Sequence, residues 1–230
     1  EPAFAYKNLF IRVDLFEKIG NTINIYEVKS KSWGHGYNRD QVNDVMITTP
    51  KRGKDKGKKT LNGSWYYYLY DLAFQKYVVE KNYPECKIES YLMLADKSKK
   101  ASIDGLNQLF QITNEPNIRT GIRRKVHSLK ETGNPIMEPR NLSQLIDDII
   151  EKNNHKIHGL SFLELVDNFT DLYTNEKEIN WKNYNGHVCR ECWMEQFNIS
   201  DEDENRPNIY ELWQFRNQKT LFKSNIFFLD

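Results

Sequence analysis

The sequence predicts a mixed α/β (α+β) fold, in which a β-sheet with a flanking helix is followed by a mostly helical region. Two patterns lead to this prediction. Polar and apolar side chains alternate along short segments in the first part of the chain, which is typical of strands. Further on, apolar residues recur at helical spacing in residues 142–150 and 162–173. We therefore expect a first domain at residues 1–112 and a mainly helical region at 113–230 that ends in the start of a following domain.

The first strands of the predicted sheet lie near the beginning of the chain. Ile11, Val13 and Leu15 alternate with polar neighbours, which places these three residues on one face of a strand. Gly20-Asn21 is a two-residue hairpin signal, and a second alternating segment follows it. We expect three strands, at residues 3–6, 9–16 and 23–30.

One helix and one further strand complete the predicted core. Ser64 is a candidate N-cap, and apolar residues recur at i, i+3, i+4, i+7 and i+8 from Tyr70 to Val78. We expect a helix at residues 65–81 and a short apolar strand at 88–94. Residues 113–185 are expected to be mostly helical.

The composition indicates a globular protein and excludes several classes. Of the 230 residues, 13% are aromatic, which is more than disordered chains contain. The net charge is only +1, so any surface that binds nucleic acid has to be local. No segment reaches the ~20 apolar residues of a membrane helix, and no signal peptide is visible. Three cysteines do not make a disulfide scaffold. We expect a cytoplasmic protein without membrane contact.

The two ends of the chain suggest that it is a fragment of a longer protein. The chain opens with Glu1 instead of Met and leads directly into strand-like sequence. Its last ten residues, 221–230, are strongly apolar. We expect further sequence on both sides.

The hairpin centred on Gly20-Asn21 brings two carboxylates together. Residues paired across it have numbers that sum to 41, so Asp14 lies opposite Glu27 and Arg12 opposite Lys29, while Val28 points into the core. Opposed side chains have Cβ atoms about 4.5–5.5 Å apart, and like charges there are destabilising. A divalent cation would remove the repulsion. The alternative is a set of ordinary surface ion pairs with Arg12 and Lys29.

The order of these residues resembles the PD-(D/E)xK nuclease signature. In that family an acidic residue at the end of one strand is followed by D/E-x-K on the next strand. Here Asp14 is followed by Glu27-Val28-Lys29, and Val13 stands where the family often has proline. The resemblance implies a restriction-endonuclease-like core.

The helix after the lysine strand narrows the resemblance to the RecB-like branch. That branch carries a glutamine on this helix, which Gln75 matches, whereas Val79 stands where a tyrosine often follows. Residues 1–111 resemble a bacterial family with a RecB-like nuclease half before an exonuclease-like half. Two further departures are the long segment 32–63 and the absence of a helix before the first strand.

The resemblance implies a role for each matched residue. Asp14 and Glu27 would bind one or two Mg²⁺ or Mn²⁺ ions, and the carbonyl of Val28 would be a further ligand. Lys29 would orient or activate the attacking water and stabilise developing charge. Gln75 would position Lys29 or the scissile phosphate.

These roles predict a metal-dependent nuclease that hydrolyses phosphodiester bonds of DNA, with single strands among its candidate substrates. A basic loop offers phosphate contacts through Lys51, Arg52, Lys54, Lys58 and Lys59, although such a loop is equally expected as a solvated surface. The alternative function is a nuclease fold that has lost catalysis and serves as a nucleic-acid-binding or scaffolding module.

Cys189 and Cys192 form a C-x-x-C near His187, the pattern of half a zinc site. Some RecB-like nucleases hold an iron–sulfur cluster with four cysteines, but only Cys86 is left to join this pair. We expect no cluster. A degenerate remnant, a zinc ligand pair and two ordinary cysteines stay open.

Overall fold

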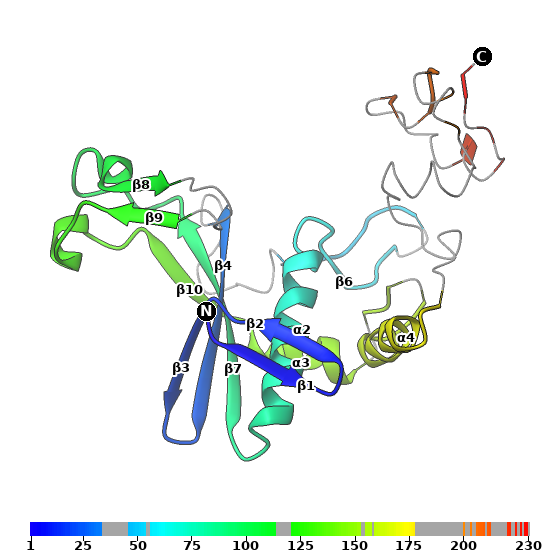
Figure 1. The fold of residues 1–230 in the computed structure, drawn as a ribbon, viewed down its shortest axis with the longest axis horizontal. Coiled ribbons are helices and arrows are strands. Elements are labelled where there is room, and N and C mark those ends of the chain that lie inside the picture. Colours follow the sequence, from blue (N-terminus) through cyan, green and yellow to red (C-terminus); the bar gives the residue numbers. More distant parts are fainter. Residues whose placement is uncertain are drawn as a thin grey trace. The chain divides into compact units, whose positions relative to one another are not determined.

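The computed structural model of the protein describes most of residues 1–177 and scattered residues after them (Figure 1). The described residues are 1–33, 46–53, 56–113, 121–152, 155–157, 159–177, 200, 203, 206–209, 211–212, 220–221, 224, 226 and 228–229. The chain divides into two compact units, Glu1–Thr170 and Asp171–Asp230. The candidate site lies in the first.

A four-stranded mixed sheet forms the centre of the first unit, and it confirms the predicted fold class. Its strands are in the order β10-β7-β4-β3. The central pair β4 and β7 is parallel, and both outer pairs are antiparallel. Parallel neighbours need a long connection, and helix α2 is part of it. The bounds are β3 Leu15–Ile19, β4 Thr22–Trp33, α2 Tyr66–Asn82, β7 Lys87–Asp96 and β10 Met137–Asn141.

The hairpin β3–β4 has the register that its turn predicts. Leu15 pairs with Tyr26 and Ile19 pairs with Thr22, so the paired numbers sum to 41. Gly20 adopts φ of 57°, the left-handed conformation that a two-residue turn of this kind requires. Extended by one residue, the register places Asp14 beside Glu27.

The strand expected at residues 9–16 is wrong as a single element. It is divided into β2 (Leu9–Arg12) and β3, with a bend at Asp14 between them. β2 pairs with β1 (Ala3–Tyr6), and Arg12 lies opposite Ala3. Arg12 was expected opposite Lys29, but the bend takes it away to a separate two-stranded sheet.

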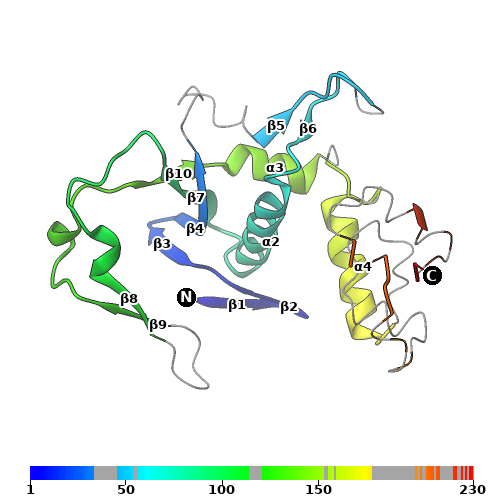
Figure 2. The ribbon, with the colours of Figure 1, turned by 90° about the horizontal axis from the view of Figure 1, so that it is seen from above.

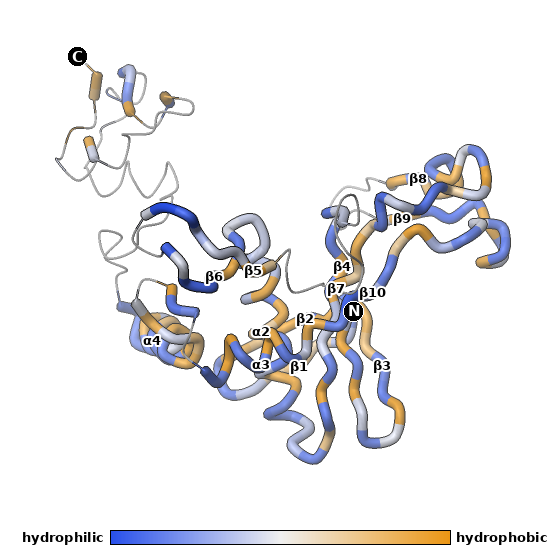
Figure 3. The backbone as a smooth tube through the Cα atoms, turned by 180° about the vertical axis from the view of Figure 1, so that it is seen from behind, coloured by the Kyte–Doolittle hydropathy of each residue, from blue (hydrophilic) through white to orange (hydrophobic). Residues whose placement is uncertain are grey.

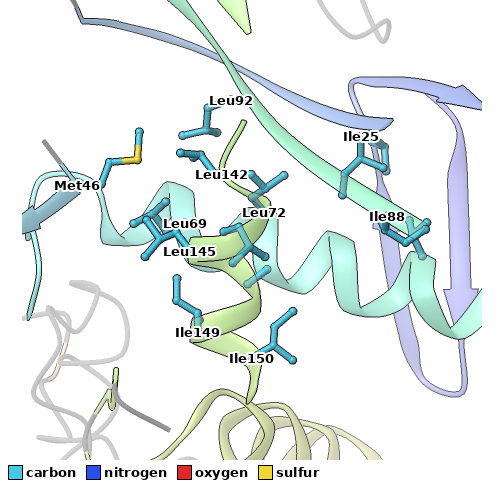
Figure 4. Close-up of a cluster of buried hydrophobic side chains, with 14 of the residues drawn as sticks. Ile25, Met46, Leu69, Leu72, Ile88, Leu92, Leu142, Leu145, Ile149 and Ile150 are labelled. Atoms are coloured by element: carbon cyan, nitrogen blue, oxygen red, sulfur yellow. The ribbon is translucent and has the colours of Figure 1, made fainter. Parts of the chain in front are cut away.

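Helix α2 lies on one face of the sheet, one residue displaced from its predicted bounds. Ile23 and Ile25 of β4 are fully buried, as are Leu69 and Leu72 of α2. Figure 4 shows Ile25, Leu69 and Leu72 among the apolar side chains that lie between helix and sheet. The expected apolar stripe of α2 included Tyr70 and the aromatic residues four and seven positions after it. These aromatic side chains are only partly buried, and the fully buried face of the helix lies beside them.

A second helix, α3 (Ser143–Glu151), packs against α2 and β7. Figure 2 shows α2 and α3 on the same side of the sheet. Because α2 is covered by both sheet and helix, its buried face is wide enough to include polar Gln75 and Lys76. Lys76 forms an ion pair across this interface with Asp147 of α3.

The prediction of a mostly helical region at 113–185 is only partly correct. Two helices, α3 and α4 (Phe162–Thr174), are present, but strands precede them. The strand β10 joins the central sheet, so the boundary expected after residue 112 falls inside the first compact unit. The additional elements are β5 Ile47–Thr48, β6 Thr60–Leu61, η1 Leu106–Leu109, β8 Phe110–Thr113, β9 Gly121–Arg124 and η2 Leu129–Thr132.

Among the helices of the described residues, none combines the length and the apolar character that a membrane span requires.

Candidate active site

The candidate site lies where the middle of β4 meets α2. Alternation along the strand places Glu27 and Lys29 on the same face as the buried Ile23 and Ile25, which is the face that α2 covers. Spacing of i, i+4 places two polar residues of α2, Asp71 and Gln75, on one side of the helix. The four polar side chains therefore face one another.

These four side chains form one hydrogen-bonded network. Gln75 Nε2 donates to Glu27 Oε2 at 2.6 Å and to Asp71 Oδ1 at 3.3 Å. Lys29 Nζ donates to Glu27 Oε1 and, at 2.9 Å, to Asp71 Oδ2. Each carboxylate therefore accepts one bond from the lysine and one from the glutamine, and strand and helix hold each other's functional groups in place.

Asp14 joins the site through the backbone of β4. Its Oδ2 accepts a hydrogen bond of 2.8 Å from the amide N–H of Val28. This bond fixes the carboxylate at the peptide unit that separates Glu27 from Val28. The structure therefore brings together Asp14, Glu27, Lys29 and Gln75, the four residues that the sequence predicts as catalytic.

The side chain of Val28 does not point into the core, contrary to our expectation. It is 38% exposed, whereas Glu27 is 7% exposed. The reason is that α2 covers the face of β4 that carries Glu27, so the neighbouring residue turns to the other face. Glu27 is consequently buried and Asp14 half-buried, which disfavours the alternative of ordinary surface ion pairs.

Burial shifts the titration of the central groups. Desolvation raises the pKa of the Glu27 carboxyl above its usual value, and the nearby Asp71 and Asp14 raise it further, against the lowering effect of hydrogen bonds from Gln75 and Lys29. Burial alone would lower the pKa of the Lys29 ammonium, but its hydrogen bonds to Glu27 and Asp71 outweigh this and raise that pKa to about 12. Lys29 is therefore a cation at neutral pH.

Asp71 was missed as a site residue. The sequence showed it only as the i, i+4 neighbour of Gln75, a spacing that also occurs on ordinary helix surfaces. In the structure it is the second acceptor for Lys29. The sequence signal that could have identified Asp71 was its position one helical turn before Gln75.

The residues present fit a small divalent cation that keeps several water ligands. Asp14 and Glu27 offer hard oxygen donors, and Mg²⁺ is commonly held by one or two carboxylates together with waters. Within the described part of the chain, no three His, Cys, Asp or Glu side chains form a group that could hold a metal by themselves. The buried Gln75 Oε1 has no hydrogen-bond partner there and leaves one acceptor available at the same place.

The other residues that were predicted to bind DNA or a metal lie away from this site or outside the described residues. Lys51, Arg52, Lys58 and Lys59 are exposed between β5 and β6, and their binding to DNA stays a prediction. Lys54 lies outside the described residues, as do both members of the C-x-x-C, Cys189 and Cys192. The predictions about an iron–sulfur cluster and about zinc therefore stay predictions.

Comparison with known proteins gives no match: no family model, no curated protein and no solved structure is similar to this chain. The chemistry of the site has to be inferred from its own residues.

Proposed function

We propose that this protein is a metal-dependent nuclease that hydrolyses phosphodiester bonds of DNA in the cytoplasm. The observation that carries the proposal is the buried network in which β4 presents Glu27 and Lys29 to Asp71 and Gln75, with Asp14 bonded to the same strand. Cleavage of a phosphodiester needs a nucleophilic water and neutralisation of charge on one phosphate. Carboxylates that bind a cation, next to a fixed ammonium, support both requirements.

The acidic residues would provide the binding site for the cation. Asp14 and Glu27 would hold Mg²⁺ or Mn²⁺, and the Val28 carbonyl would be a further oxygen ligand. The bound ion would lower the pKa of a water ligand and neutralise charge on the phosphoryl oxygens. Asp71 is engaged by Lys29 and Gln75, and its role is to hold those two side chains.

Lys29 would act as a cation and not as a general base. With a pKa of about 12, only about one molecule in 10⁵ carries a neutral amine at pH 7. Its ammonium instead donates hydrogen bonds, and a phosphate oxygen is a suitable third acceptor for its remaining proton. Gln75 Nε2 would keep the Glu27 carboxylate in the position in which it binds the cation.

The test is a cleavage assay with linear single-stranded DNA, double-stranded DNA and RNA, each with Mg²⁺, with Mn²⁺ and with EDTA. We expect metal-dependent cleavage of DNA that is lost in Glu27→Gln, Asp14→Asn and Lys29→Met. Lys29→Met should retain metal binding by calorimetry, because lysine is not a ligand, whereas Asp14→Asn should lose it. Glu17→Gln is the matched control, since Glu17 is an exposed carboxylate of the same hairpin.

Two results would overturn the proposal. Cleavage that persists in Glu27→Gln would show that another residue or a contaminant is responsible. Absence of cleavage for every nucleic acid and metal, with intact folding by circular dichroism, would leave the alternative of a non-catalytic nuclease fold that binds nucleic acid or scaffolds other proteins.

A further inference from the structure

Residues 97–136 connect β7 to β10 and are called the arm below. The arm contains η1, β8, β9 and η2, and the structure describes it except for residues 114–120. Its base is fixed by backbone hydrogen bonds from Asp96 N to Ile136 O and from Lys97 N to Trp33 O, both 2.9 Å. Figure 1 shows β8 and β9 beyond the ends of β7 and β10, connected to them by further segments of the arm. The arm therefore carries a separate two-stranded sheet whose base is joined to the four-stranded sheet of the candidate site.

The described residues of the arm carry a strong positive charge. They include seven lysines and arginines against two acidic residues, although the whole chain has a net charge of only +1. The cations are Lys97, Lys99, Lys100, Arg123, Arg124, Lys125 and Lys130, and the acids are Asp104 and Glu131. A local excess of this size in a nearly neutral protein is the electrostatic pattern of a surface that meets phosphates.

The three consecutive cations at the end of β9 are not neutralised by the protein. Arg123, Arg124 and Lys125 are all exposed. Among the residues that the structure describes, none of the three side chains forms an ion pair or a hydrogen bond. Adjacent like charges repel, so a partner with dense negative charge would stabilise this segment. Arginine in particular binds phosphate oxygens with two parallel hydrogen bonds.

The backbone that presents these cations is a narrow antiparallel ribbon. Within the described residues, β8 and β9 pair with each other alone, with Gln111 opposite Arg123 and Ile112 opposite Ile122. Alternation therefore places Gln111 and Arg123 on one face and both isoleucines on the other. Ile112 is 68% exposed and Ile122 is 66% exposed. Figure 3 shows that the ribbon carries both hydrophilic and hydrophobic residues.

A two-stranded ribbon of this kind fits the major groove of B-form DNA, which is about 12 Å wide. Glutamine can pair with base edges there, and arginine and lysine contact the flanking phosphates. The major groove of an RNA duplex is too deep and narrow for side chains to read. The shape of the ribbon thus favours duplex DNA over duplex RNA.

We propose that the arm binds double-stranded DNA, with the β8–β9 ribbon in the major groove and with Arg123, Arg124 and Lys125 on phosphates. Glu27 lies beside Leu92 of β7, and the arm begins five residues later at Lys97. Five strand residues span roughly 17 Å, which is the length of about five base pairs. The base of the arm is therefore about half a helical turn of DNA from the candidate site, and a duplex bound by the arm would be the substrate of that site. This link to cleavage rests on the proposed function, whereas binding itself does not.

The test measures binding of the full 230-residue chain to a fluorescent 20-base-pair duplex by anisotropy in EDTA, over a series of salt concentrations. EDTA prevents metal-dependent cleavage, so the result is independent of the nuclease activity. The arm variant is Arg123→Gln/Arg124→Gln/Lys125→Gln. The control variant removes three exposed cations outside the arm by Lys7→Gln/Lys81→Gln/Lys156→Gln. Single-stranded DNA and duplex RNA of the same length are the competing ligands.

We expect the arm variant to lose affinity for duplex DNA on the order of 10-fold to 100-fold, and its slope of log K against log salt to fall by about 2 to 3. The control variant should lose much less. Arg123→Lys/Arg124→Lys should keep most of the slope, which separates lost charge from misfolding. Equal losses in the arm and control variants, preference for single strands or RNA, or no duplex binding by the wild-type chain would each overturn the proposal.

Discussion

Gln75 Nε2 on α2 donates a hydrogen bond of 2.6 Å to Glu27 Oε2 on β4, although the two residues are 48 positions apart in the sequence. The bond is buried on both sides, since Gln75 is 4% exposed and Glu27 is 7% exposed. A buried carboxylate is costly unless donors surround it. The glutamine therefore makes the acidic residue tolerable in the position where the proposed chemistry needs it.

Replacement of Gln75 by methionine should destabilise the protein, because the Glu27 carboxylate loses a buried donor. We expect a loss of about 1–3 kcal/mol in the free energy of unfolding, the cost of leaving a buried polar group without its partner. Urea unfolding at pH 7 measures it. Gln144→Met is the control, because Gln144 donates only to Asp148 on an exposed face of α3, and its loss should stay within about 0.5 kcal/mol. Equal effects of the two substitutions would contradict the importance of the Gln75–Glu27 bond.

Replacement of Glu27 by glutamine should make the metal-free protein more stable while abolishing cleavage. The raised pKa of this carboxyl shows that its ionised form is less favourable in the fold than in the unfolded chain. Removing the charge therefore relieves strain among Asp14, Glu27 and Asp71. We expect a higher melting temperature for Glu27→Gln in EDTA at pH 7. Mg²⁺ should raise the melting temperature of the wild type and leave that of the variant unchanged, because binding to the native state alone stabilises it. A variant that melts below the wild type in EDTA would be evidence against this account.

The ion pair between Lys76 and Asp147 should contribute to the docking of α3 on α2. Lys76 is 4% exposed, and without Asp147 its remaining ion pair in the described part of the chain is with Glu80, at 3.5 Å. We expect Asp147→Asn to lower the free energy of unfolding by about 1–3 kcal/mol, somewhat less than the full cost of breaking a completely buried pair. Asp148→Asn removes the exposed pair with Lys152 on the same helix and should change stability by less than about 1 kcal/mol. Chemical denaturation of both variants compares them directly.

The ionised Glu89 should stabilise the fold, and this contribution should be lost at acid pH. Hydrogen bonds from Lys87, Ser143 and Asn141 lower the pKa of its carboxyl from 4.5 to about 2. A carboxyl whose pKa is lower in the folded state stabilises the fold above its unfolded pKa, and this contribution is lost as the pH falls from about 4.5 to about 2. We expect Glu89→Gln to lose about 1–2 kcal/mol at pH 7 and to approach the wild type near pH 2. Unfolding free energies measured at pH 7, 4 and 2.5 check this, and a constant difference at all three would contradict it.

The register of the hairpin and the meeting of Asp14 with Glu27 could be predicted because both depend on local sequence. Gly20 marks the turn, and the turn sets which residues pair. The covered face could not be predicted in the same way. Alternation shows that Glu27 and Val28 point in opposite directions, but only the docking of α2 decides which of them is buried.

The edge strand β10 also escaped prediction, for a physical reason. Its sequence, Met-Glu-Pro-Arg-Asn, lacks the alternation of a half-buried strand, and Pro139 cannot donate a backbone hydrogen bond. Proline is tolerated in this strand because β10 is at the edge of the sheet as the described residues form it, where it pairs with β7 on one side. Whether residues 137–141 form a strand thus depends on their pairing with β7 and not on their own sequence.

The network at the site has a consequence for the order of folding. The Lys29–Asp71 and Glu27–Gln75 bonds close loops of 42 and 48 residues, whereas the β3–β4 hairpin closes within a few residues. Long loops cost more conformational entropy to close, so the hairpin forms before α2 docks. During that interval Asp14 and Glu27 already lie side by side, with donors from β4 itself but without the donor Gln75 of α2. We therefore expect the acidic pair to form with the hairpin, and the complete network of the site to form only when the helix docks.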